Sequence, residues 1–345
     1  MSKDYTLRSY EDLGDIEPGS SHFELVQRIK PDSRVLDVGC ATGYLASALA
    51  KRGCEMYGID INPKAAEAAR AHCTAVVCDD LDAVTLLEAF PAVRFDYIIF
   101  GDVLEHLRDP WRTLEGAREV LVDRGHVVAS IPNAAHGALQ LALLQGEFDY
   151  QEFGLLDSTH LRFFTLDTVK ELFLRTGFHI EAIERTKYPI FTDGGSLVPS
   201  VAREDFDERV IELVEAQSES STLQFIIDAS SVPDSERSSM MGDYIAALRR
   251  ELSAAQRALH RSQPNPLAER VEQLRVELSE SQKQLSVTRD HVTTLTRQNA
   301  NLMSRSREIE SALDIRGAEI AEMKRSKFWK ARLVWLSLRR RFRKD

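Results

Sequence analysis

One stretch of the sequence decides the fold: Val35-Leu36-Asp37-Val38-Gly39-Cys40-Ala41-Thr42-Gly43-Tyr44. An apolar run leads into a glycine-rich turn, and a helical pattern with apolar residues at positions 45, 48 and 49 follows at once. Glycine in such a turn adopts backbone angles that side chains forbid, and it lets a ligand lie against the main chain. The following helix points its free N–H groups and its positive dipole end at that ligand. The stretch therefore predicts a strand–turn–helix unit that binds a nucleotide-like molecule.

An acidic residue in this turn indicates which nucleotide-like molecule it binds. Asp37 stands two residues before Gly39, in the order Asp37-x-Gly39-x-Ala41-x-Gly43. A dinucleotide turn reads G-x-G-x-x-G and holds a pyrophosphate, which this carboxylate would repel. The carboxylate suits a ligand with an ammonium and a sulfonium group. The stretch resembles the first motif of class I S-adenosylmethionine-dependent methyltransferases, with Ala41 in place of the usual middle glycine. The alternative is the turn of a dehydrogenase or an epimerase.

Three further strand-like segments follow in the order that this resemblance implies: residues 55–60, 75–81 and 95–100. Residues 103–110 then resemble the segment after the fourth strand in small-molecule O-methyltransferases, including those of the ubiquinone pathway. The resemblance covers roughly residues 20–232 and implies S-adenosylmethionine as the cofactor. Asp60 would accept both ribose hydroxyls, and Asp80 would lie near the adenine amine. The full set of cofactor contacts that it implies is Asp37, Gly39, Cys40, Ala41, Gly43, Tyr44, Asp60, Ile61, Asp79, Asp80, Leu81, Gly101 and Leu104.

The order of the remaining elements defines the fold class. Short Val/Ile-rich runs alternate with helical patterns, as a sheet buried on both faces requires. We expect an α/β fold, with a doubly wound, seven-stranded Rossmann-like methyltransferase sheet followed by a long α-helical coiled coil. The later elements are a fifth strand at 126–131, a helix at 166–176, a sixth strand at 178–183 and a seventh, antiparallel strand at 222–227. Insertions at 133–165 and 187–221 would lie over the cofactor and build the acceptor site.

The candidate catalytic residues lie in residues 154–165, where Asp157, His160 and Arg162 alternate with leucine and phenylalanine. A hydroxyl acceptor needs a general base, and histidine is the side chain most easily tuned near neutral pH. The segment resembles one found in methyltransferases of bacterial surface-glycan and sugar-modifying pathways. That likeness implies that His160 touches the acceptor and Asp157 orients it; the alternative is that both only hold the loop. His106 is the rival base, with helix capping as its alternative role.

The remaining expected site residues are assigned no specific chemical role in the reaction. The residues expected to bind the substrate are Arg162, His136 and Asn133, although His136, like His22, also fits a loop-packing role. No metal site is expected among Glu105, His106 and Asp109, because adjacent Glu and His side chains cannot both face one ion from a regular helix.

The chain changes character after residue 232. Apolar residues first recur at alternating spacings of four and three from Met241 to Leu259, and Pro264-Asn265-Pro266 interrupts this helix. Eight heptads follow and predict a coiled coil that holds a homo-oligomer. Asn299 in the apolar seam favours a parallel dimer, whereas the other polar residues of the seam leave a trimer open. We expect four segments: a methyltransferase domain at 1–232, a linker and first coil helix at 233–266, the coiled coil at 267–325 and a basic amphipathic tail at 326–345.

The charge distribution and the cysteine content limit which partners and which cellular compartment we expect. From Lys324 onward the chain carries ten Lys and Arg against one acid, and subtracting this +9 from the overall −10 leaves about −19 for the rest. An acidic body disfavours a nucleic-acid partner, whereas a basic tail with Trp, Phe and Leu is typical of a helix at an anionic membrane surface or of a partner-binding helix. The four cysteines form no C-x-x-C, which indicates a reduced, cytoplasmic protein.

These observations lead to one functional expectation with two alternatives. We expect an S-adenosylmethionine-dependent O-methyltransferase, peripheral on the inner membrane surface, that acts on a sugar hydroxyl of a lipid-linked polysaccharide or glycolipid. The layout of domain, rod and tail resembles that of bacterial polysaccharide chain-capping methyltransferases. The first alternative is a quinone or phenolic-lipid acceptor. The second is a non-catalytic coiled-coil scaffold, which the intact set of acidic and glycine residues disfavours.

Overall fold

The computed structural model describes residues 16–192, 197–259, 270, 272–288 and 294. The chain divides into two compact units, Met1–Arg237 and Ser238–Asp345. Most of the predicted coiled coil and the whole basic tail lie outside the described residues. Within the described residues, no helix has both the length and the apolar character needed to cross a membrane.

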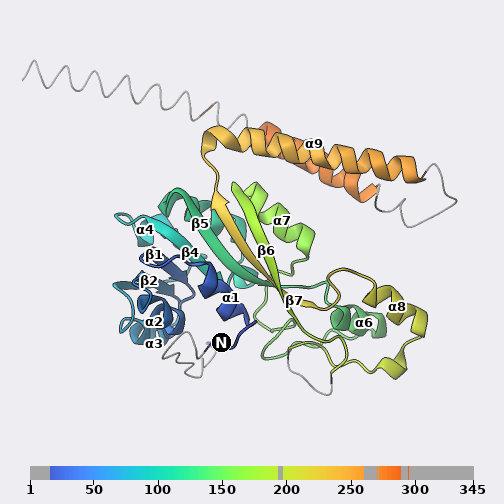
Figure 1. Ribbon diagram of the computed structural model, residues 1–345, viewed down its shortest axis with the longest axis horizontal. Coiled ribbons are helices and arrows are strands. Elements are labelled where there is room, and N and C mark those ends of the chain that lie inside the picture. Colours follow the sequence, from blue (N-terminus) through green and yellow to red (C-terminus); the bar gives the residue numbers. More distant parts are fainter. Residues whose placement is uncertain (1–15, 193–196, 260–269, 271, 289–293, 295–345) are drawn as a thin grey trace, which may run out of the picture. The chain divides into compact units, whose positions relative to one another are not determined.

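The first unit is built on one seven-stranded sheet (Figure 1). Its strand order is β3-β2-β1-β4-β5-β7-β6, and β7 runs antiparallel to both of its neighbours. This arrangement confirms the predicted methyltransferase sheet with an antiparallel seventh strand. The strands are β1 (Arg34–Val38), β2 (Glu55–Asp60), β3 (Ala75–Cys78), β4 (Phe95–Gly101), β5 (Leu121–Pro132), β6 (Phe178–Lys187) and β7 (Thr222–Ser231).

Helices cover both faces of this sheet, and each face has its own apolar core. One core joins the sheet to α4, α5 and α7, and the other joins it to α1 and α2. Burial of these apolar faces is the main favourable contribution to the stability of the unit. The helices around the sheet are α1 (Ser21–Arg28), α2 (Tyr44–Ala50), α3 (Pro63–Ala69), α4 (Leu86–Ala89), α5 (Pro110–Val120) and α7 (Leu166–Arg175).

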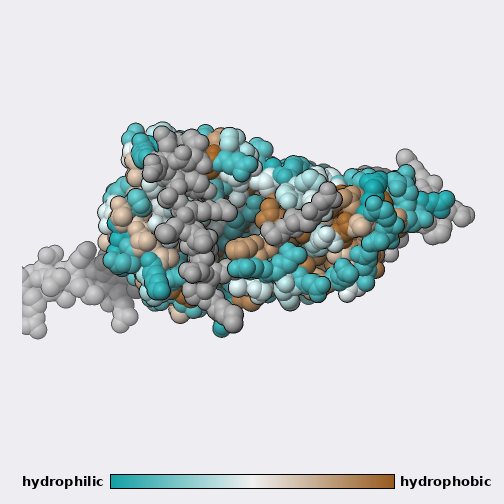
Figure 2. All heavy atoms as spheres, turned by 90° about the horizontal axis from the view of Figure 1, so that it is seen from below, coloured by the Kyte–Doolittle hydropathy of each residue, from teal (hydrophilic) through white to brown (hydrophobic). Residues whose placement is uncertain are grey.

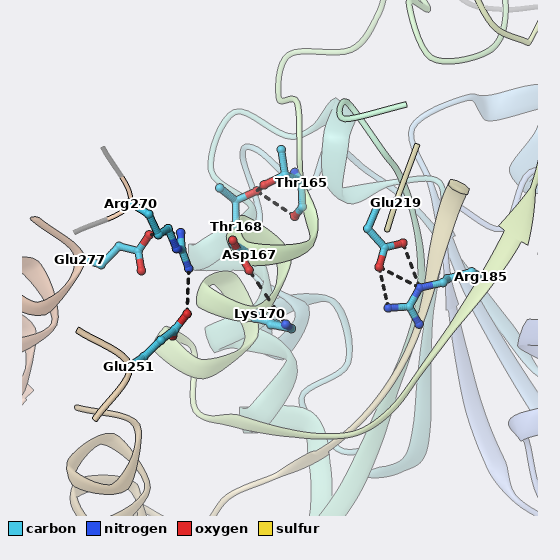
Figure 3. A network of polar contacts seen from close by, with 9 residues as sticks. All are labelled: Thr165, Asp167, Thr168, Lys170, Arg185, Glu219, Glu251, Arg270 and Glu277. Carbon is cyan, nitrogen blue, oxygen red and sulfur yellow. Dashed lines mark hydrogen bonds and ion pairs between the residues drawn. The ribbon is translucent and has the colours of Figure 1, made fainter. Parts of the chain in front are cut away.

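Strand lengths differ from the sequence expectation where polar residues continue a strand. β6 extends four residues beyond the expected end at 183, because β7 pairs with it as far as Lys187. As the edge strand of the sheet, β6 carries exposed polar side chains that hide this continuation from a hydrophobicity pattern. Arg185 on β6 also binds Glu219, just before β7, through paired contacts of 2.8–3.1 Å (Figure 3).

The two insertions pack against each other and form a small core of their own. The first carries α6 (Gly137–Gln145) and the second carries α8 (Glu208–Glu215). Gly137 lies so close to Ile190 and Val214 that an added Cβ would come within 3.0 Å of both side chains. The members of this core are Ala138, Leu141, Ala142, Leu155, Ile190, Val198, Val201 and Val214.

The second unit consists, where described, of helical segments. Most of α9 (Asp234–Leu259) belongs to it, and residues 272–288 are helical. Arg270 contacts Glu251 of α9 at 3.4 Å, so the two helical segments approach each other within one chain (Figure 3). Leu274 and Ser281, which are seven residues apart in the expected heptad seam, are both buried. An oligomeric coiled coil through residues 289–325 stays a prediction, because those seam positions lie outside the described residues.

Candidate active site

The carboxyl ends of β1, β2, β3, β4 and β5 meet at one edge of the sheet, and the loops after them form the site. The sheet order reverses between β1 and β4, the position at which ligands bind in open α/β sheets. The turn after β1 contains three consecutive odd-numbered residues with positive φ: Gly39 at 71°, Ala41 at 45° and Gly43 at 80°. Ala41 therefore holds a left-handed conformation that favours glycine, as its place in the motif implies.

Close packing ties this glycine turn to the segment after β4. An added Cβ on Gly39 would lie 2.7 Å from Cγ2 of Val103. Asp102, immediately before Val103, also has a positive φ of 53°. Its carboxylate accepts hydrogen bonds from Ser130 at 2.7 Å and from Gln224 at 2.6 Å. The residues that follow Val103 are thus held beside the glycine turn by contacts from β1, β5 and β7.

Two buried carboxylates lie beneath the turn. Oδ2 of Asp60 accepts a hydrogen bond from the Ala41 N–H at 2.8 Å, and its Oδ1 accepts one from the Asn62 N–H at 2.7 Å. Asp60 thereby fixes the shape of the glycine turn, and each oxygen keeps a second lone pair for a ligand hydroxyl. Burial raises the pKa of Asp37 to about 8, and the charge of Asp60 adds to this shift. A cationic ligand beside Asp37 would favour its ionised form.

The raised pKa of Asp37 leads us to expect a pH-dependent stability of the folded protein. Between about pH 4 and pH 8 the folded protein holds a proton on Asp37 that the unfolded chain has lost. The contribution of Asp37 therefore lowers the free energy of unfolding as the pH rises from about 4 to 8. Asp37→Asn should raise the melting temperature of the cofactor-free protein, with a gap over wild type that widens from pH 5 to pH 8. We expect at least about 2–4 °C at pH 8, the effect of 1 kcal/mol in a domain of this size. A gap that stays constant with pH would contradict the assignment.

A second group of side chains forms the other half of the site. His106 and His160 lie edge to face, with ring centroids 4.8 Å apart. Glu105, only 1% exposed, lies beside them, with its Oε1 3.9 Å from Nε2 of His160. Glu105 and His106 belong to a single 3-10 turn, Leu104–His106, whereas His160 comes from the loop between α6 and α7. The structure therefore brings together both histidines that the sequence offers as rival bases.

Backbone and loop contacts orient the two imidazoles. Nδ1 of His160 lies 3.2 Å from the Leu155 carbonyl oxygen, and Nδ1 of His106 lies 3.1 Å from the Thr159 carbonyl oxygen. Asp157 accepts a hydrogen bond from the Thr159 hydroxyl at 2.7 Å, and the same hydroxyl oxygen lies 3.1 Å from Nδ1 of His106. Asp157 thus acts through Thr159 on His106, and its charge also acts on His160, which the sequence analysis expected it to orient. Burial lowers the pKa of His160, as does the neighbouring His106.

Comparison with known proteins agrees with this geometry. Residues 20–183 match a family described as a methyltransferase domain. Residues 20–183, a little under half of the chain, therefore carry an S-adenosylmethionine-dependent methyltransferase domain. Its cofactor is S-adenosylmethionine, and the buried Asp37 and the lone pairs of Asp60 fit a ligand with a cationic end and ribose hydroxyls.

The curated relatives match a third to two fifths of this chain. A ubiquinone biosynthesis O-methyltransferase from Alkalilimnicola ehrlichii is 33% identical over 118 residues, which cover 33% of this chain and 48% of the relative. An enzyme of the same name from Cereibacter sphaeroides is 28% identical over 148 residues, or 42% of this chain and 59% of the relative. The chain thus spans about half the length of the curated relatives it matches.

Solved structures with a similar fold are more distant. A methyltransferase from Archaeoglobus fulgidus aligns with a TM-score of 0.43 and 21% identity, over 60% of this chain and 90% of that one. A magnesium protoporphyrin IX methyltransferase from Synechocystis, with bound S-adenosylhomocysteine, aligns with a TM-score of 0.41 and 16% identity, over 61% of this chain and 80% of that one.

The other expected cofactor residues of the methyltransferase fall into two groups. Ile61, Asp79 and Asp80 are exposed at the ends of β2 and β3, where a ligand can reach them, and Leu81, Tyr44 and Gly101 are half-buried at the same edge. The side chains of Cys40 and Leu104 point into apolar cores. Only the backbone of these two residues is therefore available to a cofactor.

The expected substrate residues are separated by the structure. His136 is fully buried, its Nδ1 accepts from the Ala138 N–H at 3.2 Å, and its Nε2 lies 3.0 Å from the Tyr188 carbonyl oxygen. Asn133 is also fully buried and donates to the Glu219 and Thr222 carbonyl oxygens. Both therefore hold the insertions in place, the loop-packing role that was the alternative for His136. Arg162 is exposed, stacks over Trp111 at 5.7 Å and donates to the Arg108 carbonyl oxygen.

Sequence reasoning missed a row of aromatic side chains that leads to the histidines. Ring centroids lie 6.2 Å apart from His160 to Phe163, 5.8 Å from Phe163 to Phe148 and 5.5 Å from Phe148 to Tyr150. All three aromatic residues are exposed, although buried positions are usual for phenylalanine. The signal in the sequence is the aromatic content of residues 148–164.

Proposed function

We propose that this protein transfers a methyl group to a hydroxyl of a phenolic or quinone-type lipid. The observation that carries the proposal is the Glu105–His106–His160 cluster at the inner end of the aromatic row. Relatives that match a third to two fifths of this chain are named as ubiquinone biosynthesis O-methyltransferases, which supports the same acceptor class. We therefore prefer the phenolic lipid over the sugar hydroxyl of a lipid-linked glycan.

The acceptor side favours an apolar molecule. Large exposed apolar residues gather in the insertions, and Figure 2 shows apolar surface on the half of the face that carries α6 and α8. A groove of about 300 Å³ lies beside Phe163, between Trp111 and Leu172. A contiguous apolar surface next to polar catalytic groups is typical of a binding site for a molecule with a reactive head and an apolar body. The exposed residues are Leu143, Leu144, Phe148, Tyr150, Phe153, Leu161, Phe163, Leu197 and Leu213.

The chemistry needs a positioned acceptor and a way to remove its proton. When bound, S-adenosylmethionine supplies a sulfonium methyl group that is open to in-line displacement. Contact between Gly39 and Val103 places the turn that bears Glu105 and His106 next to the cofactor turn, so an acceptor oxygen at the cluster lies on the side of the methyl donor. A neutral imidazole of the cluster accepts the proton of the hydroxyl, and the burial of Glu105 and His160 limits the access of water.

Transfer of a labelled methyl group tests the acceptor class. The full-length protein is incubated with labelled S-adenosylmethionine and a total lipid extract, which is then separated into quinone/phenolic and glycolipid fractions. We expect label in the quinone/phenolic fraction. Label confined to the glycolipid fraction would establish the sugar acceptor instead, and label in neither fraction would contradict both.

Self-association through the C-terminal segment is part of the proposal. Arg118 donates to the Val232 carbonyl oxygen at 2.9 Å and to Asp234 at 2.7 Å, so the first unit needs residues beyond 232. A fragment of residues 1–237 should be monomeric and bind S-adenosylhomocysteine with the affinity of the full chain, whereas the full chain should sediment as a dimer or trimer. An oligomeric 1–237 fragment would place the association in the methyltransferase unit.

We also propose that the basic segment 326–345 binds an anionic membrane surface, where an apolar acceptor is concentrated. Each basic residue near such a surface contributes about 1 kcal/mol, and association of several chains multiplies the effect. Co-flotation of the full chain with anionic vesicles at low salt should be lost on deletion of residues 326–345. A full chain that fails to float at low salt would instead favour docking of this segment to an acidic protein.

A further inference from the structure

The Glu105–His106–His160 cluster has the composition and spacing of a metal site. Each of the three residues offers one ligand atom, and these atoms lie within 4.8 Å of one another. Glu105 and His160 are buried and His106 is half-buried. A buried carboxylate is stabilised when a cation lies beside it. Two nitrogens and one carboxylate form a donor set that divalent transition metals bind.

The hydrogen bonds of the two imidazoles fix which nitrogen is available. A carbonyl oxygen only accepts hydrogen bonds, so Nδ1 of His160 donates to Leu155 and Nδ1 of His106 donates to Thr159. In a neutral imidazole the other nitrogen, Nε2, then carries the lone pair. Nε2 of His160 already lies 3.9 Å from Oε1 of Glu105. Histidines that bind metals usually donate their second ring N–H to a backbone carbonyl or carboxylate in this way.

We propose that Glu105, His106 and His160 bind one divalent transition-metal ion, such as Zn²⁺, Mn²⁺ or Co²⁺, with the remaining coordination positions open. Bonds of about 2.0–2.2 Å require the ligand atoms to approach one another by roughly 1 Å, which rotations of the side chains provide. Three protein ligands with an open position are typical of a catalytic rather than a structural site.

The local backbone explains why the sequence suggested no metal. A regular helix would point Glu105 and His106 in different directions. Here the turn has only three residues, and the ligand atoms of Glu105 and His106 nevertheless lie within 4.8 Å of each other and of the ligand atom of His160, which comes from a loop more than fifty residues further along the chain. Asp109, the third residue considered from the sequence, caps α5 by accepting from the Arg112 N–H at 3.0 Å.

A cation at this point would change how the acceptor hydroxyl loses its proton. A divalent metal lowers the pKa of an oxygen that it binds, as it lowers the pKa of zinc-bound water to about 7. The imidazoles would then position the ion, and the proton of the bound hydroxyl would pass to solvent water instead of to a histidine base. This last step rests on the proposed function, whereas binding of the ion does not.

Metal binding is tested on the full-length protein after removal of metals with a chelator. Titration calorimetry with Zn²⁺ and with Mn²⁺, and visible absorption with Co²⁺, should show one ion per chain for at least one metal. His106→Ala and His160→Ala should each weaken binding by at least about tenfold, because loss of even a hydrogen-bond partner of a metal ligand typically costs about 10–100-fold. His179→Ala, an exposed histidine on β6, is the matched control and should bind like wild type. Melting temperatures establish that each variant is folded.

The outcomes separate this inference from the proposed function. Absence of binding in the folded wild type, or unchanged binding in both folded histidine variants, would overturn the metal site. Full-rate methylation of the lipid fraction by a chelator-treated protein would overturn its role in the reaction while leaving the acceptor class intact. Stoichiometric metal binding without any methylated lipid would support the site and contradict the acceptor class.

Discussion

His160→Ala is expected to lower kcat for methyl transfer by about 10²–10⁴-fold, the usual cost of losing a group that assists proton removal. The proposed function assigns His160 to the acceptor, and its ring faces His106 and Glu105. The dissociation constant of S-adenosylhomocysteine should therefore stay nearly unchanged. Steady-state kinetics together with titration calorimetry measure the two quantities on the same preparation.

The matched control for this prediction is His179→Ala, which removes an exposed imidazole from the edge strand and should leave both quantities at wild-type values. His106→Ala is the informative comparison. If it reproduces the loss of kcat and His160→Ala does not, His106 alone serves the acceptor and His160 is a packing residue. If neither variant changes kcat, the reaction takes place elsewhere.

Asp60→Ala should weaken cofactor binding by tenfold or more. Each charge-assisted hydrogen bond to a ribose hydroxyl contributes about 1.5–3 kcal/mol, and the substitution removes both. The structure adds a second reason, since the same carboxylate holds the Ala41 N–H and thus the shape of the glycine turn. Titration with S-adenosylhomocysteine measures the loss, and thermal unfolding establishes that the protein is folded.

Asp123→Ala is the control, because Asp123 is an exposed carboxylate at the start of β5 and lies on no loop of the site. It should leave the affinity unchanged. An Asp60→Ala protein that binds the cofactor like wild type would show that the ribose lies elsewhere and that Asp60 serves only to support the turn.

The fold was largely predictable because its signals are local. Residues 35–44 specify a strand, a turn and a helix start within ten positions, and the apolar runs of β2 and β4 begin at the expected residues. Strand ends were less predictable where pairing rather than hydrophobicity decides them. β5 begins at Leu121, five residues before the expected start, because Leu121 pairs with Phe95 across a bulge.

The site was predictable in its residues but not in its contacts. His106 and His160 were both singled out, yet 53 positions separate Thr159 from the His106 ring that it holds, and no spacing rule reports such a contact. Asp157 was assigned to the nearer histidine for the same reason. His136 and Asn133 look like binding residues in a loop sequence, and only their complete burial shows that they anchor the insertions.

The way the imidazoles are held has a consequence for how acceptor preference can change during evolution. His160 and His106 are oriented by the carbonyl groups of Leu155 and Thr159, and every residue type supplies the same carbonyl. The side chains that we propose to face the acceptor, such as Phe148, Tyr150 and Phe163, make no hydrogen bond to either ring among the contacts described. Substitutions in this loop can therefore redirect the enzyme to a differently shaped acceptor while its catalytic geometry stays intact.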